Sequence, residues 1–143
     1  MLTYLIDDDI ISLYLAEQVL RLEDFTLDMQ LFQTAEAALT CLVEHLPTQV
    51  PEVIFLDLNM PTMDGWGFLQ ALEPYVPVLQ HRCRIYILTS SLALADTTRA
   101  KDYLLVANVL CKPLDTPEVL AIKALLQEKV ADNSPRERSE QQS

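Results

Sequence analysis

Short apolar runs alternate with longer segments of helical periodicity along most of the chain. The apolar runs predict strands at residues 2–6, 25–32, 53–56, 84–88 and 104–110. The intervening segments predict helices at residues 10–22, 34–46, 66–75, 92–103 and 115–130. The first of these helices shows the pattern well, because Ile11, Leu15 and Val19 recur on one helical face.

Polar residues at the starts of three predicted helices are suited to capping them. Asp9 stands directly before one helical segment and Thr34 begins the next, and both are expected to be N-caps. Asp115 and Thr116 are the cap candidates for the last helix, and Pro117 fits its first turn. Pro, Asp and Gly residues predict a loop over residues 59–67.

Alternation of strand and helix, repeated five times, predicts an α/β fold with a doubly wound parallel sheet covered by helices on both faces. The strand at 25–32 is partly polar, which places it nearer an edge of that sheet. We expect a single domain over residues 1–130. Residues 131–143 are polar and aperiodic, and we expect this tail to be disordered.

Composition narrows the class of protein further. The chain has 143 residues, half of them hydrophobic, which suffices for one domain with a sizeable core. Its net charge of -11 disfavours direct binding to DNA but leaves a basic protein partner open. Three cysteines without metal-like spacing predict no disulfide. No signal peptide or membrane-spanning run is visible, so the expected location is cytoplasmic, without a membrane partner.

Chemically active side chains follow the strands. The carboxyl ends of parallel strands meet at one edge of a sheet, where ligands bind. The residues that the sequence places at this edge are Asp7, Asp8, Asp9, Asp57, Thr89, Ser90 and Lys112. The edge is therefore expected to carry a cluster of carboxylates with a hydroxyl and an ammonium group.

Such a cluster needs a cation. Two like charges 4 Å apart repel by about 4 kcal/mol at an effective dielectric of 20. Lys112 supplies only one positive charge, and oxygen ligands favour Mg²⁺ as the remaining cation. A carboxylate in this setting can attack phosphorus and form an acyl phosphate, with cationic groups stabilising the transferring phosphoryl group.

Four motifs, each at the end of a predicted strand, carry a resemblance to a known family. They are Ile6-Asp7-Asp8, the run from Phe55 to Gly65 (FLDLNMPTMDG), Leu88-Thr89-Ser90 and Cys111-Lys112-Pro113. Over residues 2–130 the chain resembles the receiver domains of two-component response regulators. This resemblance implies a flavodoxin-like sheet of order 2-1-3-4-5 and phosphorylation by a histidine kinase or phosphotransfer protein. It also implies a protein that is not an enzyme beyond its own phosphorylation and dephosphorylation.

The resemblance also implies individual roles. Asp57 corresponds to the phosphoacceptor, and Asp57, Asp8, Asp7 and the backbone carbonyl of Asn59 correspond to the Mg²⁺ site, Asp7 acting partly through water. Lys112 would pair with the phosphoryl group, and Thr89 would be the switch hydroxyl. A cis peptide is expected at Lys112-Pro113. Gly65 is expected to permit the backbone turn after the loop.

One position departs from the family pattern. Val109 stands three residues before the lysine, where the family usually has Tyr or Phe coupled to the switch threonine. A degenerate receiver that acts as a phosphorylation-independent binding scaffold is therefore the alternative function. A phosphatase is disfavoured, because Asn59 stands where such enzymes usually place a second aspartate.

Structural interpretations of the same residues remain open at this point. Asp7 and Asp8 could form a solvated turn, Thr89 could cap the next helix, and Lys112 could be a surface lysine. The brief polar segment after Val130 predicts a stand-alone regulator whose output is a downstream protein target. Homodimers are common in the family, and the sequence does not decide whether this chain forms one.

Overall fold

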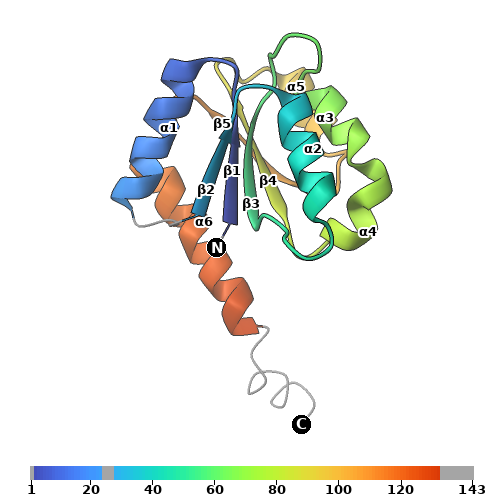
Figure 1. Ribbon diagram of the computed structural model, residues 1–143. Coiled ribbons are helices and arrows are strands. Elements are labelled where there is room, and N and C mark those ends of the chain that lie inside the picture. The colour runs from blue at the N-terminus through green and yellow to red at the C-terminus, as the bar shows by residue number, and fades with distance from the viewer. Residues whose placement is uncertain (1, 24–27, 133–143) are drawn as a thin grey trace.

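A computed structural model of the chain describes residues 2–23 and 28–132 (Figure 1). Its five strands are β1 (Leu2–Ile6), β2 (Asp28–Phe32), β3 (Val53–Asp57), β4 (Arg84–Thr89) and β5 (Val106–Cys111). All of them pair in parallel, in the order β2-β1-β3-β4-β5. This confirms the predicted flavodoxin-like topology, and the partly polar strand β2 does lie at an edge.

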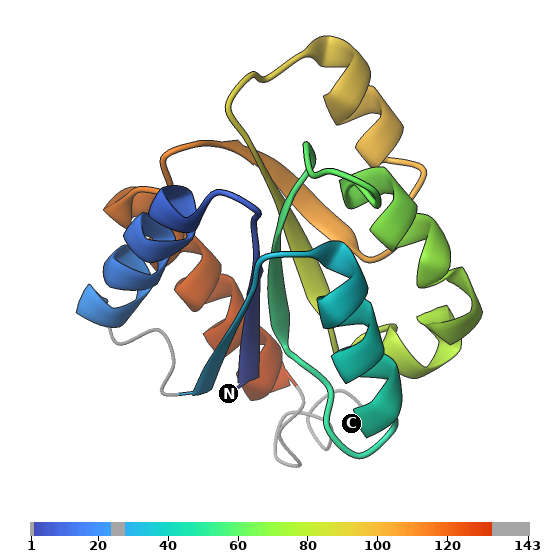
Figure 2. The same ribbon diagram turned by 45° about the horizontal axis from the view of Figure 1, so that its top comes forward.

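Helices cover both faces of the sheet, as predicted (Figures 1 and 2). One face carries α1 (Ile10–Leu22) and α6 (Thr116–Asp132). The other carries α2 (Ala35–His45), α3 (Gly65–Ala71), the 3₁₀ turn η1 (Glu73–Tyr75), α4 (Val76–Leu79) and α5 (Leu94–Ala100). Within the described residues, no helix is both long and apolar enough to cross a membrane.

The core divides into two clusters because successive side chains of a strand point to opposite faces. In the central strand β3, Ile54 and Leu56 belong to the cluster under α2 and α3, and Phe55 to the cluster under α1 and α6. All five residues of β3 are buried, as expected of a strand with neighbours on both sides and helices on both faces. The central strand therefore holds Asp57 on a rigid support.

Several element boundaries differ from the predictions. The helix predicted at 66–75 is divided into α3 and the 3₁₀ turn η1, and α4 follows directly after it. Pro74 and Pro77 occupy the first turns of η1 and α4. The helix predicted at 92–103 covers only Leu94–Ala100, and its N-cap residue, Ala93, makes no side-chain hydrogen bond. The last strand begins at Val106 rather than at residue 104.

Two predicted segments lie partly outside the described residues. The strand predicted at 25–32 is seen from Asp28 onward, and residues 25–27 are not described. Of the tail predicted at 131–143, residues 131 and 132 continue helix α6, and residues 133–143 are not described.

The predicted caps are confirmed in their hydrogen bonds. The Asp9 carboxylate accepts from the backbone N–H groups of Ile11 and Ser12, and the Thr34 hydroxyl accepts from that of Ala37. At the start of α6, Asp115 and Glu118 accept from each other's backbone N–H groups, which is a capping box. The three cysteines are free, as predicted, and Cys111 is exposed.

We expect Tyr86→Phe to raise the free energy of unfolding by about 1 kcal/mol, because a buried hydroxyl without a hydrogen bond carries a desolvation penalty. The Tyr86 side chain is buried, and its hydroxyl has no hydrogen-bond partner among the described residues. Tyr4→Phe is the matched control, since the Tyr4 hydroxyl donates to the Cys41 sulfur. Urea unfolding of both variants checks the prediction, and an equal loss of stability in both would contradict it.

Candidate functional site

Acidic and basic side chains from three strand ends meet at the carboxyl edge of the sheet, which faces forward in Figure 2. Asp7 follows β1, Asp57 ends β3 and Lys112 follows β5. The Lys112 Nζ lies 2.7 Å from Asp7 Oδ2 and 3.2 Å from Asp57 Oδ1. Both carboxylates are buried, and the Lys112 side chain is only 17% exposed. The alternative interpretation of Lys112 as a surface lysine is therefore wrong. Lys112 joins two carboxylates that lie far apart in the chain.

Asp7 is held in place from both of its oxygens. One oxygen accepts from Lys112, and the other accepts from the backbone N–H of Asp9 at 2.9 Å. Its own backbone N–H donates to the carbonyl of Phe32, which ties the end of β1 to β2. The contribution of the Asp9 backbone was not predicted from the sequence. The only signal for it is the tendency of Asp side chains to bond to the backbone two residues ahead.

The carboxylates form a set of oxygen donors suited to a hard divalent cation. One oxygen each from Asp7, Asp8 and Asp57 lies within 4.8 Å of the others. Asp8 is exposed and the other two are buried, so the cluster opens to solvent on the Asp8 side. Mg²⁺ prefers such oxygens and retains several waters, which an open side permits. The residues present therefore fit the predicted ion.

Thr89 lies at the end of β4, the strand next to β3, and is buried. Its hydroxyl donates to the carbonyl of Ser91 at 3.0 Å and accepts from the N–H of Ser91 at 3.2 Å. The hydroxyl thus bonds within its own loop. The N-cap residue of α5 is Ala93, so the interpretation of Thr89 as the cap of that helix is wrong.

The loop between β3 and α3 folds back against the end of β3. The Gly65 N–H donates to the carbonyl of Leu58 at 2.9 Å. A Cβ on Gly65 would lie 2.7 Å from the Asp57 carbonyl oxygen and 2.9 Å from the Leu58 Cα, both of them backbone atoms. Glycine is therefore required by close approach, and not by the special backbone conformation that we expected, because its φ is not positive. Asp64 caps α3 through the N–H of Gly67.

Burial dominates the electrostatics of Asp57. It raises the pKa of Asp57 from 3.8 to about 6, assisted by the charge of Asp7 and opposed by Lys112 and by the backbone N–H of Asn59. Burial also lowers the pKa of Lys112, but the hydrogen bond and charge of Asp7, followed by those of Asp57, outweigh it and raise that pKa overall. The ammonium thus stays charged, and its single charge leaves the carboxylates under-compensated.

We expect the metal-free protein to lose about 3 kcal/mol of stability as the pH rises from below 4 to above 6, because each pKa unit is worth about 1.36 kcal/mol. The pKa of Asp57 is about 6 in the folded state, against 3.8 for an aspartate in an unfolded chain. Between these values the folded protein keeps a proton that the unfolded chain has released. This contribution is complete below pH 4 and is lost above pH 6. Subtracting the pH profile of Asp57→Asn in EDTA isolates it, and parallel profiles would contradict it.

The structure also describes the surroundings of these side chains. The Lys112-Pro113 peptide is cis, as expected. Val109 lies on β5 and packs on the core under α2 and α3. The aromatic side chain of Tyr86, on the neighbouring strand β4, belongs to the cluster on the opposite face of the sheet, so it does not lie on the same face as Val109. Trp66 is nearly buried at the start of α3 and packs beneath Arg99, whose guanidinium carbon lies 4.4 Å from its ring centre.

Comparison with known proteins agrees with this geometry. Residues 3–123 match the family described as response regulator receiver domain. No curated protein matches the chain significantly. Among solved structures, a two-component response regulator from Cytophaga hutchinsonii superposes with a TM-score of 0.80 at 25% identity, covering 90% of this chain and 96% of that one.

Two further solved structures show the same likeness. A response regulator receiver protein from Dyadobacter fermentans is 26% identical with a TM-score of 0.73, covering 90% of this chain and 96% of its own. A two-component response regulator from Legionella pneumophila, 24% identical, has a TM-score of 0.75 over 90% of this chain and 98% of its own, which shows the shared fold. With its sheet order, its acidic edge and a family match over residues 3–123, the chain belongs to the response regulator receiver domains.

Proposed function

We propose that this protein is a phosphoacceptor response regulator of a two-component system, which accepts a phosphoryl group on Asp57 from a histidine kinase or a phosphotransfer protein. The observation that carries the proposal is the ion pairing of Lys112 with both Asp7 and Asp57 at the open edge of the sheet. A lysine in this position both holds the carboxylates together and offers its charge to an incoming phosphoryl group.

Each site residue takes part in a way that its surroundings support. Asp57 ends the central strand, and its raised pKa of about 6 still leaves it ionised, and therefore nucleophilic, at neutral pH. Asp8 is exposed on the open side of the cluster, so it is proposed as a direct Mg²⁺ ligand. Both oxygens of Asp7 already accept hydrogen bonds, which favours contact with the ion through water.

Two further roles complete the proposal. The exposed Asn59 follows Asp57 by two residues, and its backbone carbonyl is proposed as a ligand of the ion. Thr89 is proposed as the switch hydroxyl, which would exchange its bonds to Ser91 for a bond to the phosphoryl group. When bound, Mg²⁺ would supply positive charge next to the phosphoryl oxygens. The protein then catalyses no reaction beyond its own phosphorylation and dephosphorylation.

The proposal is tested by intact mass measurement after incubation with acetyl phosphate. With Mg²⁺ present, we expect the protein to gain the mass of one phosphoryl group. EDTA should prevent the gain, because three close carboxylates repel a phosphoryl donor unless a cation compensates them. Absence of any adduct under both conditions would refute the phosphoacceptor function.

The degenerate scaffold remains the second candidate, and Val109 is the observation that favours it. An aliphatic side chain cannot swing between buried and exposed positions as the usual aromatic does, so the output surface need not respond to phosphorylation.

The downstream partner in either case is proposed to be a protein and not DNA, in agreement with the net charge of -11. An adduct in the mass experiment would separate the two functions.

Exposed apolar side chains at the start of α1 suit the docking of a phosphodonor protein. Ile10, Ile11 and Tyr14 are 64%, 67% and 58% exposed, directly after the aspartates of the site. A donor that brings its phosphoryl group to Asp57 must cover this end of the helix. Burial of such side chains in a protein interface is a large favourable term.

We therefore expect Ile11→Asp to slow phosphotransfer about tenfold from any histidine kinase that phosphorylates the wild-type protein. Labelling by acetyl phosphate should be unchanged, because this small donor needs no docking surface. Leu22→Asp is the matched control, since Leu22 is 79% exposed at the far end of the same helix. Equal rates of kinase transfer for the two variants would place the docking surface elsewhere.

A further inference from the structure

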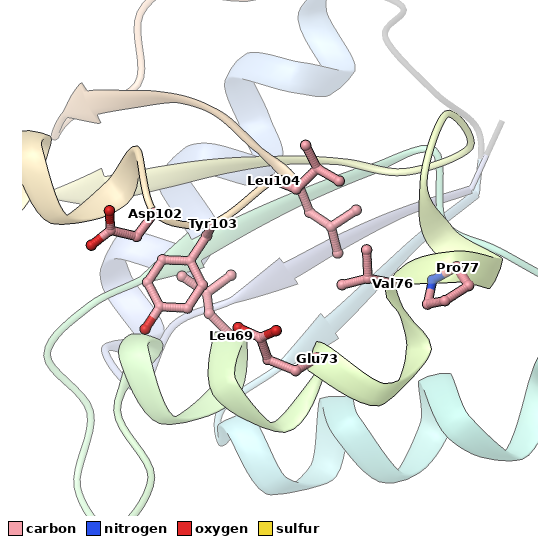
Figure 3. A pocket seen from close by; sticks show the side chains of 8 residues that line it. Leu69, Glu73, Val76, Pro77, Asp102, Tyr103 and Leu104 are labelled. Atoms are coloured by element: carbon pink, nitrogen blue, oxygen red, sulfur yellow. The ribbon is translucent and has the colours of Figure 1, made fainter.

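An apolar groove of about 400 Å³ lies between α3–α4 and the segment that joins α5 to β5 (Figure 3). The helices α3 and α4 are on the opposite side of the domain from α1 (Figure 1). The lining residues of the groove are Leu69, Glu73, Val76, Pro77, Asp102, Tyr103, Leu104 and Leu105. None of them belongs to the phosphorylation site. The segment 102–105 leads into the amino-terminal end of β5, whereas Lys112 follows its carboxyl end. The groove and the site are therefore at opposite ends of this strand.

The groove has a mainly apolar lining, and one of its apolar side chains, Leu104, is strongly exposed. Leu69 and Leu105 are buried and form part of the core, so the base of the groove is fixed. Leu104 projects beside them and is 68% exposed. The Tyr103 ring packs against the ring of Trp66, with 5.8 Å between the two ring centres, which helps to fix its position. A preformed hollow with an exposed leucine at its rim is typical of a binding surface.

Two carboxylates flank the apolar surface from opposite walls. Glu73 comes from η1, and Asp102 comes from the segment after α5 (Figure 3). Both residues are exposed, and neither carboxylate forms a salt bridge with any residue that the structure describes. Their charges are thus available to an external cation. They add to the field of a chain with 21 acidic and 10 basic residues.

We propose that this groove docks a basic partner segment, which inserts an apolar side chain between Leu104 and Val76 and places a flanking Lys or Arg beside Glu73 and Asp102. Charge complementarity selects this occupant. A second copy of the chain would bring a net charge of -11 against the same charge, which opposes self-association through the groove. Docking is independent of Asp57, so it goes beyond the proposed phosphoacceptor function.

The probe for this surface is a fluorescein-labelled amphipathic peptide of about 14 residues, with leucines at helical spacing and lysines elsewhere. A second peptide has the same leucines and glutamates in place of the lysines. Fluorescence anisotropy with the unphosphorylated full chain is expected to show saturable binding of the lysine peptide only. Phosphorylation plays no part in this measurement, so its outcome does not depend on the function of Asp57.

Three variants locate the binding. Glu73→Gln combined with Asp102→Asn is expected to weaken binding about fivefold at low salt, from the loss of two rim charges. Glu44→Gln combined with Glu52→Gln removes the same total charge from exposed residues that do not line the groove, and should leave the affinity within about twofold. Leu104→Ser is expected to weaken binding about tenfold, and its exposed position keeps the fold intact.

Several outcomes would overturn the proposal. They are absence of saturable binding of the lysine peptide, equal binding of the glutamate peptide, and equal weakening by the two charge variants, which would indicate attraction to the overall field. A fourth outcome that would overturn the proposal concerns self-association, which sedimentation of the chain alone measures. A dimer that Leu104→Ser dissociates would assign the groove to a second copy in place of a basic partner.

Discussion

An Asp57→Asn variant is expected to take up no phosphoryl group from acetyl phosphate and Mg²⁺, under conditions that label the wild-type protein fully. The amide is nearly isosteric with the carboxylate but is not a nucleophile for phosphorus. The metal-free variant should also be more stable at pH 7, by up to about 3 kcal/mol, because the folded protein no longer holds a buried charge next to Asp7. Burial and the charge of Asp7 are the same two causes that raise the pKa of Asp57 to about 6.

Asp8→Asn is the matched control, since it removes one carboxylate from the same cluster. It keeps the nucleophile, so the adduct should still form, although at higher Mg²⁺ concentrations. Intact mass at a series of Mg²⁺ concentrations separates the two variants, and urea unfolding in EDTA gives their stabilities. An acid-labile adduct on Asp57→Asn would show that another residue accepts the phosphoryl group.

The sequence was sufficient to predict the sheet and the meeting of Asp7, Asp57 and Lys112 at its carboxyl edge. Strand order follows from the alternation of strand and helix together with the family motifs. A motif residue reaches the carboxyl edge of the sheet simply because it stands at the end of its strand. Asp7, Asp57 and Lys112 come together because the carboxyl ends of parallel strands share one edge, whatever the helices between them do. The convergence of these side chains was therefore predictable even where helix boundaries were not.

Features that depend on contacts between distant segments could not be predicted in this way. The register between β4 and β5 shifts between Ile85 and Tyr86, and no pattern in the chain marks that irregularity. The bonds of the Thr89 hydroxyl to Ser91 depend on how its loop closes. The groove joins residues far apart in the chain, such as Leu69 and Tyr103, with no periodicity between them.

The role of Gly65 shows the same limit at a single residue. Its position after the loop that follows β3 was clear from the sequence, but the reason for a glycine was not. A backbone turn through positive φ is a local property, whereas the close approach to the Asp57 carbonyl depends on how the loop returns to β3. In the same stretch it is Thr62 that has a positive φ, of 68°.

Lys112→Met is expected to lower the free energy of unfolding by about 3 kcal/mol in EDTA at neutral pH, since removal of one partner leaves buried charges uncompensated. The side chains of Asp7 and Asp57 are each only 7% exposed, so solvent screens them poorly. Mg²⁺ should recover much of this loss, because a dication bound to the folded state stabilises it by mass action. Labelling by acetyl phosphate should fall about a hundredfold with the loss of a charge at the phosphoryl group.

Lys101→Met is the control for the loss of a lysine, as Lys101 is exposed and forms no ion pair with the described residues. It should change stability by less than about 0.5 kcal/mol. The double variant Lys112→Met/Asp57→Asn separates the two effects, because it lowers the charge of the cluster without restoring a nucleophile. We expect it to regain stability in EDTA and to remain unlabelled. If it stays as unstable as Lys112→Met alone, the ion pair between Lys112 and Asp57 does not govern stability, and the pair with Asp7 at 2.7 Å does.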